Sequence, residues 1–113
     1  RSYSNSLRLV FMSTLNLINK SPFERNCLES CLRLASADSS ILFIEDGVYA
    51  ALEKTSKSEL IKDNQNGLNF FVLSNDISAR GLTEMAIIDG IKMIDYGGFV
   101  DLVEAHDAVH SWL

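Results

Sequence analysis

Apolar residues along this chain gather in short runs separated by polar segments, and the run Ile41–Ile44 is the most informative. Its four consecutive apolar residues leave neither face of a strand polar, which predicts a strand buried on both sides. Glu45 and Asp46 follow directly, Gly47 permits a tight turn, and Val48–Leu52 continues with residues that a helix tolerates. The stretch therefore predicts a central parallel strand, an acidic turn and a helix.

Strands and helices are expected to alternate along the rest of the chain. The other segments with strand patterns are Thr14–Ile18, Leu68–Leu73, Ile91–Ile94 and Val109–Leu113. Helical patterns begin at Pro22 and fall within Glu53–Asn66, Ser74–Arg80, Thr83–Ile88 and Gly98–His106. This order predicts a small three-layer α/β fold, in which helices flank a mainly parallel sheet of about five strands. We expect residues 12–113 to form a single domain and residues 1–11, which show no helical period, to be an extension outside it.

The first helix carries the sharpest local signal in the chain. Ser21 and Glu24 form a capping box and Pro22 suits the first helical position, so a helix is expected to begin there. Its apolar residues recur at spacings of three and four and make one broad stripe: Phe23, Cys27, Leu28, Cys31, Leu32, Leu34 and Ala35. We expect this stripe to face the core.

Composition and charge exclude several classes of protein. With 113 residues, 47% of them hydrophobic, the chain can build one core, and its longest apolar runs fall far short of the roughly 20 residues of a membrane span. The ten Lys and Arg residues are scattered, which disfavours direct binding of nucleic acid. No secretory signal is apparent, so we expect a cytoplasmic protein. The net charge of −5 is concentrated in residues 82–113, where Lys92 is the one base against Glu84, Asp89, Asp95, Asp101, Glu104 and Asp107.

Few motifs for catalysis or cofactor binding are present. The chain has no G-x-G-x-x-G, no P-loop lysine and no G-x-S-x-G, so no cofactor is expected. His106 and His110 have the i,i+4 spacing of metal ligands, but Asp107-Ala108 is expected to break the helix and no third ligand is evident. We interpret them as ordinary surface histidines.

Cys27 and Cys31 are the two candidate nucleophiles. A buried helical cysteine is more often a small apolar side chain than a reactive thiol. A disulfide between residues four apart would strain the helix, because their Cβ vectors run parallel. Cys31 also lies about ten residues beyond the helix cap, where the helix dipole no longer stabilises a thiolate.

Three polar pairs each follow a predicted strand. They are Glu45-Asp46, Asp76 with Arg80, and Asp95-Tyr96. Ligands of open parallel sheets bind beyond the carboxyl ends of the strands, so these residues either line one crevice or serve separately as caps and turns.

Four segments together resemble the DsrH/TusB family of small sulfur-relay subunits: INKSPFERNCLESCLRLA, ILFIEDGVYAAL, FFVLSNDISARGL and IKMIDYGGFVDLVEAHDAVHSWL. The resemblance extends from Met12 to Leu113. It implies a DsrE-like α/β fold and assembly with DsrE-like and DsrF-like subunits into a heterohexamer, which passes persulfide sulfur to a DsrC- or TusE-type carrier. The main persulfide cysteine of such complexes is on the E-type subunit, so a sulfurtransferase role for this chain itself is uncertain.

The two branches of the family differ at Cys31. The stretch SPFERNCLESCLRLA resembles the DsrH branch, which has a cysteine at this position and serves oxidation of stored sulfur. The TusB branch, which serves 2-thiouridine formation in tRNA, commonly lacks it. On this basis we expect a DsrH-like subunit with Cys31 as its candidate catalytic residue. The alternatives are a TusB-like subunit and a non-catalytic structural subunit in which Cys31 is inert.

Overall fold

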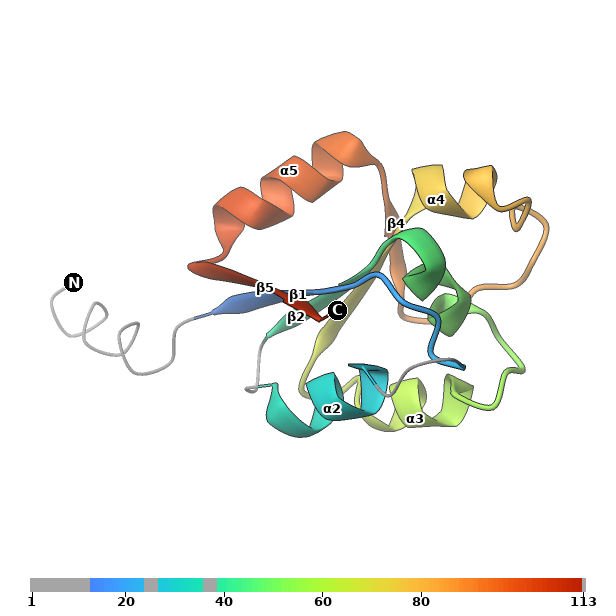
Figure 1. The fold of residues 1–113 in the computed structure, drawn as a ribbon, viewed down its shortest axis with the longest axis horizontal. Helices are drawn as coiled ribbons and strands as arrows, with labels where there is room; N and C mark the ends of the chain where they lie inside the picture. Colours follow the sequence, from blue (N-terminus) through green and yellow to red (C-terminus); the bar gives the residue numbers. More distant parts are fainter. Residues whose placement is uncertain (1–12, 24–26, 36–38, 113) are drawn as a thin grey trace, which may run out of the picture.

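The apolar run at Ile41 forms the central strand of a five-stranded sheet in the computed structural model, which describes residues 13–23, 27–35 and 39–112 (Figure 1). This strand, β2 (Ser40–Phe43), is buried at all four positions, as its pattern predicts. The order of strands is β4-β3-β2-β1-β5, and every neighbouring pair is parallel. The flanking strands are β1 (Thr14–Ile18), β3 (Asn69–Leu73), β4 (Lys92–Ile94) and β5 (Ala108–Trp112).

Helices cover both faces of the sheet, which confirms the three-layer α/β prediction. Helices α2 (Cys27–Leu34) and α3 (Ser58–Asp63) lie on one face, and α4 (Ser74–Ala79) and α5 (Tyr96–Ala105) lie on the other (Figure 1). The predicted helix after the acidic turn is a 3₁₀-helix, η1 (Glu45–Ala51), and it includes the acidic residues themselves. Within the described ranges, no helix is long and apolar enough to cross a membrane.

The larger core lies between the sheet and the layer of α2 and α3. Alternate strand residues point into it, including Ile18, Ile41, Phe43, Phe70 and Val72, and the rings of Phe43 and Phe70 are stacked with centroids 6.1 Å apart. The intervening positions Leu15, Leu42 and Leu73 are also buried, on the face toward α5. Both faces of the central strands are therefore buried, which explains their continuous apolar sequence.

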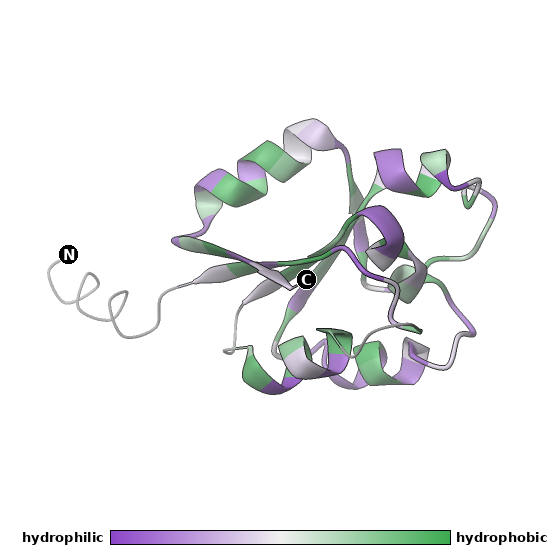
Figure 2. Cartoon of the chain, in the orientation of Figure 1, coloured by the Kyte–Doolittle hydropathy of each residue, from purple (hydrophilic) through white to green (hydrophobic). Residues whose placement is uncertain are grey.

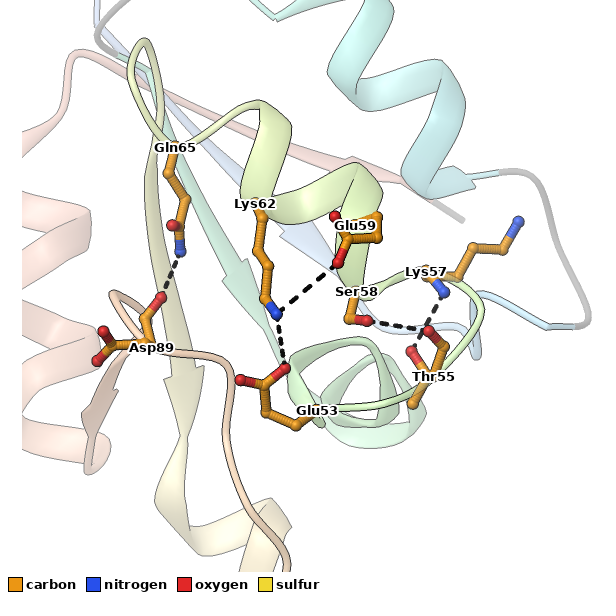
Figure 3. A network of polar contacts seen from close by, with 8 residues as sticks. All are labelled: Glu53, Thr55, Lys57, Ser58, Glu59, Lys62, Gln65 and Asp89. Atoms are coloured by element: carbon orange, nitrogen blue, oxygen red, sulfur yellow. Dashed lines mark hydrogen bonds and ion pairs between the residues drawn. The ribbon is translucent and has the colours of Figure 1, made fainter.

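Polar contacts fix α3 and the loops around it (Figure 3). Lys62 on α3 forms ion pairs with Glu53 (3.0 Å) and with Glu59 (3.9 Å). The Gln65 side chain donates a hydrogen bond to the carbonyl oxygen of Asp89 (2.8 Å). Lys57, just before α3, also pairs with Glu29 of α2, so the two helices of this layer are joined.

The helical turn predicted over Thr83–Ile88 does not extend along this segment. This segment instead forms turns and a bridge in which Leu52 and Ile87 pair in antiparallel fashion. The backbone N–H of Glu53 donates to the carbonyl of Ala86 (2.9 Å), and that of Ile88 donates to Ala51 (2.8 Å). Because these groups bond to Ala51 at the end of η1 and to Glu53 just beyond it, they are not available to a local helix.

The start of α2 differs in part from the prediction. The described helix begins at Cys27, and Pro22 and Phe23 lie in a turn. The N–H of Phe23 donates to the hydroxyl of Ser21 (3.3 Å), whereas Glu24, the other half of the capping box, lies outside the described residues, as do residues 1–11. Two members of the predicted apolar stripe, Phe23 and Leu34, are exposed, so the buried face is narrower than its pattern indicates.

Candidate functional site

Four charged residues that follow β2 and β3 meet at the carboxyl end of the sheet: Glu45, Asp46, Asp76 and Arg80. We refer to them as the acidic edge cluster. The guanidinium of Arg80 donates through Nε to Asp46 Oδ1 (3.0 Å) and lies 3.6 Å from Asp76 Oδ1. Asp76 Oδ2 accepts the backbone N–H of Glu45 (2.7 Å). The structure thus brings together two of the three polar pairs that the sequence places after strands.

The turn that carries this cluster is strained and closely packed. Glu45 has a φ of 49°, a left-handed conformation that costs a residue with a side chain roughly 1–2 kcal/mol. Gly47 packs so closely on β1 that a Cβ atom there would lie 2.0 Å from the carbonyl oxygen of Ile18. Strain of this kind persists only where surrounding contacts impose it, and here Asp76 holds the N–H of Glu45.

Asn19 is a member of this edge that sequence reasoning missed. Its Nδ2 donates to Glu45 Oε1 (3.2 Å), so the end of β1 is joined to the end of β2. The signal was present, since Asn19 directly follows a predicted strand in the same way as the other residues of the edge.

The third pair, Asp95-Tyr96, does not join the cluster. Asp95 is the N-cap of α5, and its Oδ1 accepts the N–H of Gly98 (2.9 Å). Tyr96 begins α5 and is exposed. This pair therefore follows the alternative interpretation, in which such residues are caps.

The acidic edge cluster is suited to binding rather than to covalent chemistry. It combines three carboxylates with one guanidinium, so a positively charged group would offset its excess of negative charge. An open cavity of about 410 Å³ adjoins it, lined by Ser21, Phe23, Asp46 and Tyr49. Neither cysteine lines this cavity.

Cys31 lies inside the protein on α2, with an exposed fraction of zero. Burial, together with the charge of the neighbouring Cys27, raises the pKa of the Cys31 thiol to about 12. Cys31 is a free thiol, and Cys27 is half-buried. An isolated chain with this geometry holds Cys31 as a neutral, apolar side chain.

The two predicted surface histidines have different surroundings. His106 is half-buried: its Nδ1 donates to the carbonyl of Leu102 (2.7 Å), and its Nε2 lies 2.8 Å from the hydroxyl of Ser40 on β2. His110 on β5 is exposed and packs against Trp112, with ring centroids 4.7 Å apart. Across the part of the chain that the structure describes, no three His, Cys, Asp or Glu side chains are grouped to hold a metal ion.

Comparison with solved structures supports the fold. The chain is similar to the YchN protein of Escherichia coli, with a TM-score of 0.77 and 15% identity over 88% of this chain and 98% of that one. It is also similar to protein MTH1491 of Methanobacterium thermoautotrophicum, with a TM-score of 0.66, 16% identity and the same coverage. At these identities the likeness concerns the fold alone, and it confirms the expected DsrE-like architecture.

Comparison of sequences identifies the family. Residues 20–109 match the family model described as DsrH like protein. A TusB protein of Yersinia enterocolitica is 38% identical over 95 residues, which cover 84% of this chain and 96% of that protein. A TusB protein of Yersinia pestis is 38% identical over 98 residues, with coverage of 87% and 99%. The chain therefore belongs to the DsrH/TusB family.

Proposed function

We propose that this chain is a TusB-like subunit of a sulfur-relay complex, in which it contributes binding surfaces rather than a reactive thiol. Its curated relatives carry the name TusB, which favours the alternative from the sequence over the DsrH assignment. In this proposal it assembles with DsrE-like and DsrF-like subunits in the cytoplasm. The complex delivers persulfide sulfur to a TusE-type carrier for 2-thiouridine formation in tRNA, without direct contact between this chain and the nucleic acid.

The observation that carries the structural role is the environment of Cys31. Sulfur transfer requires a thiolate that attacks sulfane sulfur, because the neutral thiol is a poor nucleophile. The Cys31 side chain is fully buried and its pKa is raised to about 12. With a pKa this high, on the order of one Cys31 side chain in 30,000 is ionised at pH 7.5, compared with about one in ten for an ordinary thiol.

The test is the intact mass of each subunit after the co-expressed complex is exposed to inorganic polysulfide. We expect sulfur to be added to a partner subunit, and this chain to keep its native mass in the complex as purified. Cys31→Ser and Cys27→Ser are the matched variants, one at each thiol. A gain of sulfur on this chain that Cys31→Ser abolishes and Cys27→Ser retains would refute the structural role.

A second candidate has one observation in its favour. The stretch SPFERNCLESCLRLA resembles the DsrH branch and places a cysteine at position 31. In that candidate Cys31 accepts or relays persulfide sulfur, the carrier is of the DsrC type, and the pathway is the oxidation of stored sulfur. It requires the assembled complex to open the site around Cys31 and lower its pKa, and the same mass measurement distinguishes it from the structural role.

A further inference from the structure

Helix α5 is apolar in composition, yet none of its residues is buried. Three of its large side chains are exposed at successive turns: Tyr96 (55%), Val100 (56%) and Val103 (38%). They are spaced by four and three residues, so they form one continuous stripe along the helix. We call these three residues the α5 stripe.

A different side of the helix attaches it to the sheet. Phe99 and Leu102, three residues apart on α5, are half-buried, and so is His106, which directly follows the helix. His106 is anchored on β2 through Ser40. The α5 stripe therefore belongs to the part of the helix that the sheet leaves uncovered. Figure 2 shows hydrophobic segments along α5.

The other large apolar side chains that are exposed among the described residues do not form a row on one helix. Each comes from a separate segment or strand of the chain: Phe23, Leu34, Met85, Met93 of β4 and Val109 of β5. Single exposed apolar residues are normal on protein surfaces, whereas a row on one helix is typical of a surface that another protein covers.

Charge indicates what covers the stripe. Asp101 and Glu104 are exposed on the same helix, and residues 82–113 contain six acids against one base. A second copy of this chain would bring acidic borders together and repel. A partner whose apolar surface is bordered by Lys or Arg would complement the stripe in both respects.

We propose that the α5 stripe is the docking surface for one of the related subunits, through an apolar patch with a basic border on that partner. This inference rests on the proposed function, because it takes the partner from the DsrE-like and DsrF-like subunits. It adds which surface of this chain binds and which chemistry the partner presents there.

The experiment measures the affinity of the full chain for purified DsrE-like and DsrF-like subunits by calorimetry at two salt concentrations. We expect Val100→Lys to weaken binding of one subunit at least tenfold and Glu104→Lys to weaken it several-fold, with native affinity falling as salt rises. Leu34→Lys, at a more exposed apolar residue on α2, is the matched control and is expected to bind as the native chain does. Circular dichroism checks that each variant is folded, and the milder Val103→Gln provides a second test.

Each result has a distinct meaning. Native-like affinity for both Val100→Lys and Val103→Gln overturns the docking surface but leaves the proposed function intact. Absence of any complex with the native chain overturns both. A homodimer of the native chain that Val100→Lys dissociates would show that a second copy occupies the stripe, and would also overturn the inference.

Discussion

Replacing Gly47 by alanine tests the packing of the turn that carries the acidic edge cluster. The added Cβ would lie 2.0 Å from the carbonyl oxygen of Ile18 and 2.8 Å from its carbonyl carbon. Ordinary contacts of this kind are 3.4 Å or longer, so the turn has to move away from β1 by more than about 1 Å. The atoms in the way are backbone, so no side-chain rotation relieves the clash.

The displacement would break a contact that joins the two strands. The same Ile18 oxygen accepts the N–H of Ile44 (3.0 Å), and the N–H of Gly47 donates to the carbonyl of Ile44 (2.8 Å). Overpacking costs about 1–3 kcal/mol, and the loss of a buried hydrogen bond adds about 1 kcal/mol or more. We expect Gly47→Ala to lower the free energy of unfolding by about 3 kcal/mol, a large fraction of the ~5–15 kcal/mol typical of a domain.

Urea denaturation followed by circular dichroism measures the effect. A loss of about 3 kcal/mol moves the midpoint down by about 1–3 M, given the usual slopes for small domains. Gly67→Ala is the matched control, because a Cβ there has no neighbour within 4 Å and its backbone is not left-handed. That variant is expected to keep the native midpoint or to rise slightly. Equal midpoints for Gly47→Ala and the native chain would refute the packing argument.

Two further predictions concern the thiol and the strained turn. Because burial raises its pKa to about 12, Cys31 in the isolated chain should react with iodoacetamide at pH 7.5 at least a thousandfold more slowly than a model thiol. The contribution of the neutral Cys31 thiol to the free energy of unfolding is fully present below the unfolded-state pKa of about 8.5 and is lost as pH rises toward 12. Peptide mass spectrometry of the folded Cys27→Ser variant measures this, and rapid alkylation of Cys31 would contradict it. Asp76→Ala removes the acceptor for the N–H of Glu45 and should lower the free energy of unfolding in urea by about 1–2 kcal/mol. Glu45→Gly relieves the left-handed strain but removes the exposed hydrogen bond from Asn19, so it should cost less than Asp76→Ala; the opposite order would show that Asp76 does not hold the turn.

The strands could be predicted from the sequence because each one has a local signature. The run Ile41–Ile44 has no polar residue that could face solvent, and its first three residues are buried in β2. The segment Thr83–Ile88 has no comparable signature, since its conformation depends on bonds to η1, more than thirty residues earlier in the chain. The exposure of Phe23 and Leu34 is also nonlocal, because helix periodicity gives a direction but not the extent of the opposing surface.

The sequence predicts where the acidic edge cluster lies but not which residues belong to it. Parallel strands bring their carboxyl ends to one edge, which placed Glu45, Asp46, Asp76 and Arg80 together. The same rule does not distinguish a cluster member from a helix cap, and Asp95 is a cap because α5 begins directly after it. The spacing of Cys31 on α2 predicts its burial, but the large increase in its pKa follows only from how completely the structure buries it.

The topology of the sheet explains why α5 retains an uncovered apolar side. β4 and β5 are the two opposite edges of the sheet, so the connection between them has to cross its full width. The sheet is parallel, so this connection also has to return from the carboxyl end of β4 to the amino end of β5. Residues 95–107 make it, and ten of these thirteen residues belong to α5. It crosses on the face where Leu15 and Leu42 are buried, and one side of the helix is sufficient to cover them. The chain still carries valine at positions 100 and 103 on the outer side, where folding of the single chain does not require it, and burial by a partner subunit gives these residues a role.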